Sequence, residues 1–206
     1  MTRAEVLSLT GAAVLAAGLV MASARRSSTM LTLARLQALA LATAGAALAI
    51  LTAQSGYGVF AALALLGKIL MPYRLVSRLA GGTEAPSATG GTPRSGLGDA
   101  RIATRLAAAV ALMALSLTVL PPPSAIDGID LSATAALAGF LIGLLALALA
   151  ADAPGRAAAA LGCENALMLA ALGIPGGTAA ACLQAAGLCA AAVLYARARP
   201  QAEAGT

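Results

Sequence analysis

Apolar runs of about 20 residues recur along this chain, and each ends at a charge or a helix-breaking residue. A helix needs about 20 mostly apolar residues to cross ~30 Å of hydrocarbon. The breaks between the runs are rich in Arg, Pro and Gly, which end apolar helices. We therefore predict an all-α, polytopic transmembrane helix bundle of about seven spans: Ala4–Ala24, Ser28–Ala53, Tyr57–Leu79, Ile102–Leu120, Ile129–Ala151, Gly155–Ile174 and Thr178–Ala198.

The composition supports a membrane environment. Of 206 residues, 60% are hydrophobic and 10% are charged, whereas soluble domains contain about 25% charged residues. So few charges cannot cover a surface that faces water. The net charge is +5, but the Arg residues lie at the ends of apolar runs and aromatic residues make up only 2%. We expect a lipid bilayer, and not a nucleic acid, as the partner of this surface.

The distribution of Arg predicts the topology. If the N-terminus is outside, the outer side holds only Arg3, and the loops 54–56, 121–128 and 175–177 contain no Lys or Arg. The expected cytoplasmic side holds the following residues: Arg25, Arg26, Arg74, Arg78, Arg94, Arg101, Arg105, Arg156, Arg197 and Arg199. This asymmetry favours seven spans, a cytoplasmic C-terminus and a bacterial inner membrane. Ala22-Ser23-Ala24 resembles a signal-peptide cleavage site, but Arg25 and Arg26 oppose translocation there.

A segment rich in Gly, Ser, Thr and Pro divides the chain. Residues 80–101 have no apolar periodicity and are expected to form a flexible cytoplasmic linker. The predicted organisation is a three-span N-terminal bundle (1–79), this linker, a four-span C-terminal bundle (102–199) and a cytoplasmic tail (200–206).

Lys68 is the most unexpected residue, because it lies near the middle of the span Tyr57–Leu79. A central lysine costs roughly 2.5–3.5 kcal/mol to insert and must face protein or water. Pro72 follows at i+4 and lacks an N–H, so the carbonyl of Lys68 loses its helical partner. This pattern favours a proton carrier at a helix break. The alternative is a static ion pair that fixes helix packing.

Four further polar residues are candidates for a proton path. Glu164 and Asn165 lie near the middle of the sixth expected span, where a carboxyl group can load and release a proton or form a structural bond, even to Lys68. Gln37 can sit on a polar path through the second span. Arg35 belongs either to that path or to the headgroup layer, which its side chain can reach.

The chain contains no histidine, and its three cysteines lie inside apolar runs without a C-x-x-C motif. We therefore expect neither a cofactor nor a metal in this chain, and no catalytic residue.

Three segments resemble the hydrogenase-4 component E family: RRSSTMLTLARLQAL (Arg25–Leu39), GVFAALALLGKILMPYRL (Gly58–Leu75) and GCENALM (Gly162–Met168). That family is similar to the K subunit of proton-pumping NADH:quinone oxidoreductase and to the C subunit of Mrp-type antiporters. Two features depart from these patterns. At the positions nearest to the membrane carboxylates of the K subunit, this chain has Gln37 and Lys68 in place of carboxylates. After Glu-Asn it has Ala166, where members of the component E family commonly have Gly.

The resemblance implies a non-catalytic membrane-arm subunit of a redox-driven ion pump of the formate hydrogenlyase type. Its partners would be antiporter-like and other membrane subunits, with a [NiFe] or related redox centre and iron–sulfur clusters in partner subunits. Lys68 and Glu164 would then contribute to proton translocation, although the sequence leaves proton and sodium ions both open. The alternatives are a structural scaffold for antiporter-like subunits and a subunit of a cation/proton antiporter.

Overall fold

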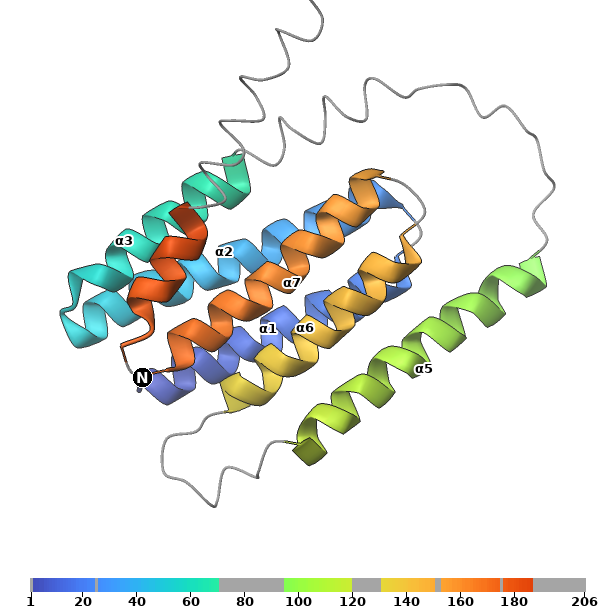
Figure 1. The fold of residues 1–206 in the computed structure, drawn as a ribbon, viewed down its shortest axis with the longest axis horizontal. Coiled ribbons are helices and arrows are strands. Elements are labelled where there is room, and N and C mark those ends of the chain that lie inside the picture. The colour runs from blue at the N-terminus through green and yellow to red at the C-terminus, as the bar shows by residue number, and fades with distance from the viewer. Residues whose placement is uncertain are drawn as a thin grey trace, which may run out of the picture.

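The computed structural model describes residues 2–24, 26–70, 95–119, 131–150, 153–174 and 176–186, and the ordered elements in these ranges are helices (Figure 1). The elements are α1 (Arg3–Ser23), α2 (Ser27–Thr52), α3 (Ser55–Ala64), the π-helical η1 (Leu65–Leu70), α5 (Ser95–Val119), α6 (Leu131–Leu149), α7 (Ala153–Gly173) and a helix over residues 178–186. The predicted all-α class is confirmed for this part of the chain.

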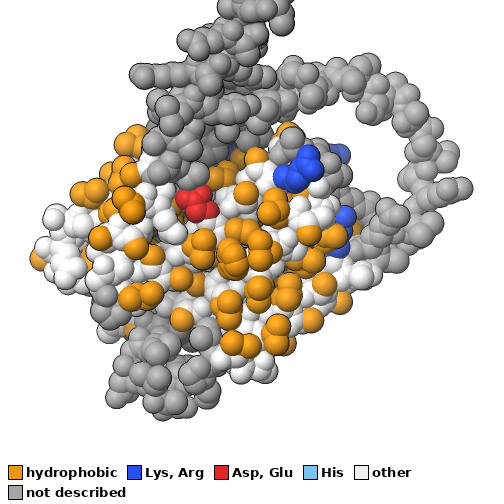
Figure 2. Space-filling view, viewed as in Figure 1, with side chains coloured by type: hydrophobic (Ala, Val, Ile, Leu, Met, Phe, Trp, Pro, Cys, Tyr) orange, Lys and Arg blue, Asp and Glu red, His pale blue; other side chains and the backbone are white. Residues whose placement is uncertain are grey.

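Among the described residues, four helices are long and apolar enough to cross a membrane: Arg3–Ser23, Ser27–Thr52, Ile102–Val119 and Ser132–Leu149. Ser55–Gly67 forms a shorter apolar helix. Large apolar side chains such as Leu9, Leu36 and Ile50 point outward, and the visible face of the bundle carries few charged groups (Figure 2). An exterior with so many large apolar side chains would promote aggregation in water, so these helices indicate a membrane protein.

Local sequence signals begin and end the N-terminal helices. Thr2 and Glu5 form a capping box at the start of α1, with Thr2 N–H donating to Glu5 Oε2 at 2.7 Å. The helix ends at Ala24, whose backbone is extended. Ala53 closes α2 in the left-handed region at φ 54°, which turns the chain directly into α3.

The helix α5 begins earlier than the sequence indicates. It starts at Ser95, whereas residues 95–101 were expected to belong to the linker. Helical bonding therefore extends there beyond the apolar run that begins at Ile102. The remainder of the expected linker up to residue 94 lies outside the described residues.

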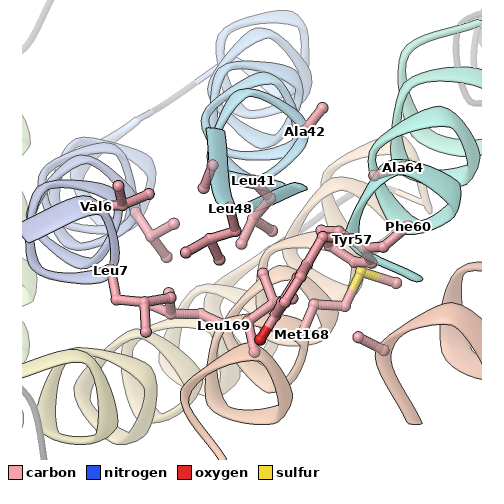
Figure 3. Packing of buried hydrophobic residues seen from close by; sticks show 14 of the residues in the cluster. Val6, Leu7, Leu41, Ala42, Leu48, Tyr57, Phe60, Ala64, Met168 and Leu169 are labelled. Atoms are coloured by element: carbon pink, nitrogen blue, oxygen red, sulfur yellow. The ribbon is translucent and has the colours of Figure 1, made fainter. Parts of the chain in front are cut away.

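Helices that precede residue 71 and helices that follow residue 94 share one core. Helices α1, α2, α6 and α7 pack together, α3 lies beside α2, and α5 lies at the outside against α6 and α1 (Figure 1). The main apolar cluster includes Leu7 of α1, Leu48 of α2, Phe60 of α3 and Leu169 of α7, which meet in the interior (Figure 3). The C-terminal helix α7 is therefore packed directly against the N-terminal helices.

Glycines set the closest helix contacts. A Cβ built on Gly45 of α2 would lie 2.8 Å from Phe60 Cδ1 of α3, and one on Gly143 of α6 would lie 2.7 Å from Cys163 Sγ of α7. Both distances are below van der Waals contact. Small residues at these positions permit the close packing that stabilises helix pairs in lipid.

Arg3 closes the end of α7. Its Nη2 donates to the carbonyls of Leu172 and Gly173 at 3.2 and 3.4 Å. The last carbonyls of a helix have no intrahelical partner and carry partial negative charge, so a guanidinium stabilises them. We expect Arg3→Gln to lower the free energy of unfolding by about 0.5–1 kcal/mol, measured by denaturant titration in detergent micelles.

Arg26 offers a matched control for this prediction. It is exposed at the start of α2, and its side chain forms no capping bond there. Arg26→Gln should leave the unfolding free energy within error of the wild type. An equal loss in both variants would mean that overall charge, and not the contact with α7, determines the effect.

Candidate functional site

Two buried amide side chains meet where α1, α2 and α7 come together. Gln37 of α2 is 2% exposed and Asn165 of α7 is 0% exposed. Asn165 Nδ2 donates to the Ala34 carbonyl at 3.0 Å and to Gln37 Oε1 at 3.2 Å. Gln37 Nε2 donates onward to the Val14 carbonyl of α1 at 2.9 Å. We call these two side chains and two carbonyls the amide bridge.

Within the amide bridge, the Asn165 amide donates to two acceptors on α2. Both hydrogens of the Asn165 amide are directed to acceptors, and each carbonyl can accept a second bond beside its helical one because it has two lone pairs. An amide buried in an apolar medium without partners would cost several kcal/mol. The bridge avoids that cost and links three helices at the same time.

Small residues make room for the amide bridge. A Cβ on Gly18 would lie 3.6 Å from Gln37 Nε2, and a Cβ on Gly162 would lie 3.6 Å from Gln37 Oε1 and 3.3 Å from Met21 Sδ. Both glycines face the Gln37 side chain from neighbouring helices. A larger side chain at either position would crowd the amide from α1 or from α7.

Opposite charges flank the bridge. Glu164 directly precedes Asn165 in α7, and Arg35 directly follows Ala34, whose carbonyl Asn165 binds. Both charged side chains are half-buried. One potential carboxylate and one guanidinium therefore adjoin, in the sequence, a buried and neutral pair of hydrogen-bonded amides.

Lys68 lies in η1, the π-helical turn Leu65–Leu70 that continues α3. The structure does not describe its side chain, but the backbone register places the residue. Helices α2 and α3 run antiparallel, and a Cβ on Gly45 would meet Ala61 Cβ at 3.3 Å. Seven residues onward from Ala61 is Lys68, and seven back from Gly45 is Ala38, so the backbone of Lys68 lies at about the level of Ala38 and its neighbour Gln37.

The π-helical turn is itself informative. Single π-turns within α-helices are rare and occur often at functional sites, because they widen the helix and redirect its side chains. Pro72 lies outside the described residues, so its expected effect on the carbonyl of Lys68 stays a prediction.

The five polar candidates from the sequence thus fall at one level of the bundle. The structure joins Gln37 and Asn165 by a hydrogen bond, and Glu164 directly precedes Asn165 in the chain while Arg35 lies two residues before Gln37. It also adds the carbonyls of Val14 and Ala34, which no sequence signal identifies because every residue has such a group. The contact of Arg3 with the end of α7 was likewise not foreseen, since it depends on tertiary packing.

Comparisons with protein-family models, with curated proteins and with solved structures found no match for this chain.

Proposed function

We propose that this chain is a non-catalytic membrane-arm subunit of a redox-driven ion-pumping complex similar to hydrogenase-4 and formate hydrogenlyase. In this proposal it crosses the bacterial inner membrane seven times, with the N-terminus outside and the C-terminus in the cytoplasm. Antiporter-like and other membrane subunits are its neighbours, and partner subunits hold the [NiFe] or related centre and the iron–sulfur clusters. Lys68 and Glu164 take up and release protons as neighbouring subunits change state.

One observation carries the proposal: two buried amides and three residues with ionisable side chains lie at about one level of a mainly apolar bundle. The amide bridge occupies the buried centre, with Glu164 and Arg35 beside it and the backbone of Lys68 at about the same level. Polar and ionisable groups are rare inside membrane proteins because insertion costs free energy, and those present commonly belong to proton relays. The π-helical turn at Lys68 adds a local backbone irregularity of the kind found at functional sites.

The test uses membrane vesicles that contain the assembled complex. For Glu164→Gln and Lys68→Met, we expect proton uptake to fall by about tenfold, because a relay residue that cannot titrate interrupts the path. Electron transfer in the soluble arm should remain near the wild-type rate. Glu164→Asp, which keeps a titratable carboxyl group, should retain more proton uptake than Glu164→Gln.

Matched controls separate a local role from a change of net charge. Glu5→Gln removes a carboxyl group and Arg26→Met removes a cation, as the test variants do, but at exposed positions away from Glu164 and Lys68. Both should pump like the wild type. Wild-type proton uptake in Glu164→Gln and Lys68→Met together would refute the proposed relay.

A second candidate function is a structural scaffold that holds antiporter-like subunits in place. The hydrogen bonds of the amide bridge favour it, because both amide hydrogens of Asn165 are already used in contacts between helices. For the scaffold, Glu164→Gln and Lys68→Met should release partner subunits from the complex on a native gel. The relay instead predicts an intact complex with impaired pumping.

A further inference from the structure

A cavity lies between the peripheral helix α5 and the bundle. Its volume is about 180 Å³. Side chains from α1, α5 and α6 line it: Ser8, Ala12, Leu15, Met113, Leu117 and Thr134. Ala135 and Ala138 of α6 complete the wall, and their small side chains leave room for the cavity.

Physical chemistry restricts what can fill this cavity. Its walls are mainly apolar and offer two hydroxyl groups, whereas each buried water needs two to four polar partners. A cavity of about 150 Å³ lined by apolar side chains stays free of water and binds benzene. The present cavity has a similar volume, so it fits a short length of hydrocarbon better than a cluster of waters. The cavity lies beside α5 at the outside of the bundle, where the surroundings are lipid for a bundle that spans a membrane.

The two hydroxyl groups are a second, independent observation. Other hydroxyls on the same helices bond back to their own helix: Thr10 Oγ1 donates to the Val6 carbonyl at 2.7 Å, and Ser116 Oγ to the Leu112 carbonyl at 2.9 Å. Within the described ranges, Ser8 and Thr134 make no such bond, and both are half-buried in the cavity wall. A hydroxyl that faces hydrocarbon without a partner is unfavourable, so an acceptor at this place would be stabilising.

The depth of these hydroxyls identifies the kind of acceptor. The start of α1, the start of α6 and the end of α5 lie at one end of the bundle (Figure 1). Ser8 is five residues after Arg3, or about 8 Å along the helix axis at 1.5 Å per residue, and Thr134 is three residues after Leu131. With Arg3 among the headgroups, this depth corresponds to the border between the hydrocarbon and the headgroup layer of a bilayer. The glycerol ester carbonyls of phospholipids lie there, with acyl chains extending inward.

We propose that this cavity is a phospholipid site, in which one acyl chain fills the space between α1, α5 and α6 and an ester carbonyl accepts hydrogen bonds from Ser8 and Thr134. The bound lipid also explains how α5 is held. Among the described elements this helix packs mainly against α6 and α1, and a chain in the cavity adds contact between α5 and the bundle.

The test measures lipid retention by the purified full-length chain. After detergent washing, a diester phosphatidylethanolamine is added, and bound lipid is counted by native mass spectrometry. The wild type should bind one molecule in preference to bulk detergent. Ala12→Leu, which extends a side chain into the cavity, should weaken binding by about tenfold, because the acyl chain loses its space.

Ala13→Leu is the matched control, since Ala13 is also exposed on α1 but does not line the cavity. It should retain lipid like the wild type. Equal retention by Ala12→Leu and Ala13→Leu, or no retained lipid on the wild type, would overturn the proposal. Circular dichroism spectra of both variants establish that they keep their helical content.

A second comparison tests the hydroxyl contacts separately. A diether phospholipid has the same chains but lacks the ester carbonyls. The wild type should bind the diester more tightly than the diether by about threefold, in line with one modest hydrogen bond. The double variant Ser8→Ala/Thr134→Ala should lose this preference while still binding lipid. A preference that persists in the double variant would show that the ester carbonyl binds elsewhere.

Discussion

Gly143→Leu is expected to lower the free energy of unfolding by about 3 kcal/mol, because it inserts a side chain where two helices touch. A Cβ at this position would lie 2.7 Å from Cys163 Sγ, 3.0 Å from the backbone nitrogen of Cys163 and 3.2 Å from its Cα. Two of these atoms belong to the backbone and cannot rotate away. Helices α6 and α7 must therefore separate, and the loss is measured by denaturant titration in micelles with helicity as the signal.

Smaller variants give this prediction a graded control. Gly143→Ala should also destabilise, and adding Cys163→Ala should recover part of the loss by removing the sulfur atom but not the backbone contacts. At Gly58 of α3, an added Cβ would meet only Ala49 Cβ, at 3.9 Å. Gly58→Ala should thus be neutral or stabilise by up to about 1 kcal/mol through helix propensity. Equal effects at Gly58 and Gly143 would contradict the close α6–α7 contact.

Asn165→Leu is expected to cost about 2–3 kcal/mol of unfolding free energy, although it keeps a similar side-chain volume. The variant removes two hydrogen bonds between α7 and α2 and leaves Gln37 Oε1 buried without its donor. Gln37→Leu should cost less, about 1–2 kcal/mol, because Asn165 keeps its bond to the Ala34 carbonyl.

The double variant tests the amide bridge as a unit. Gln37→Leu/Asn165→Leu should lower the unfolding free energy by about 1 kcal/mol less than the sum of the two single variants. Each single variant leaves the remaining amide without one of its partners, whereas the double variant removes both amides. Gln184→Leu is the control, since Gln184 Oε1 is a buried oxygen without a hydrogen-bond partner in the described structure. That variant should be neutral or stabilising. Strict additivity at Gln37 and Asn165 would show that the two amides do not interact.

These stability measurements also bear on function. The bridge attaches the segment of α7 that carries Glu164 to α2, so Asn165→Leu should weaken the support of Glu164 without removing its carboxyl group. If the chain acts as a relay, Asn165→Leu should pump better than Glu164→Gln. If it acts as a scaffold, Asn165→Leu should impair assembly more strongly than Glu164→Gln.

The sequence alone determined where helices form. Apolar runs bounded by Arg, Pro and Gly predicted helices whose ends agree closely with the structure at α1, α2 and α7. This succeeds because hydropathy and helix-breaking residues act locally. The expected span from Ile102 agrees with the apolar part of α5, whereas the helix itself begins at Ser95, within the segment expected to be a linker.

Only the tertiary structure decided which polar residues meet. Gln37 and Asn165 are 128 positions apart, and nothing in either segment indicates that one amide donates to the other. The pairing depends on how α1, α2 and α7 pack, and that packing is set by glycines whose partners lie in distant segments. The same holds for the cavity beside α5, because its volume arises from alanines on one helix and the position of another. Helix formation follows from neighbouring residues, whereas the site and the cavity follow from contacts between helices that are far apart in the chain.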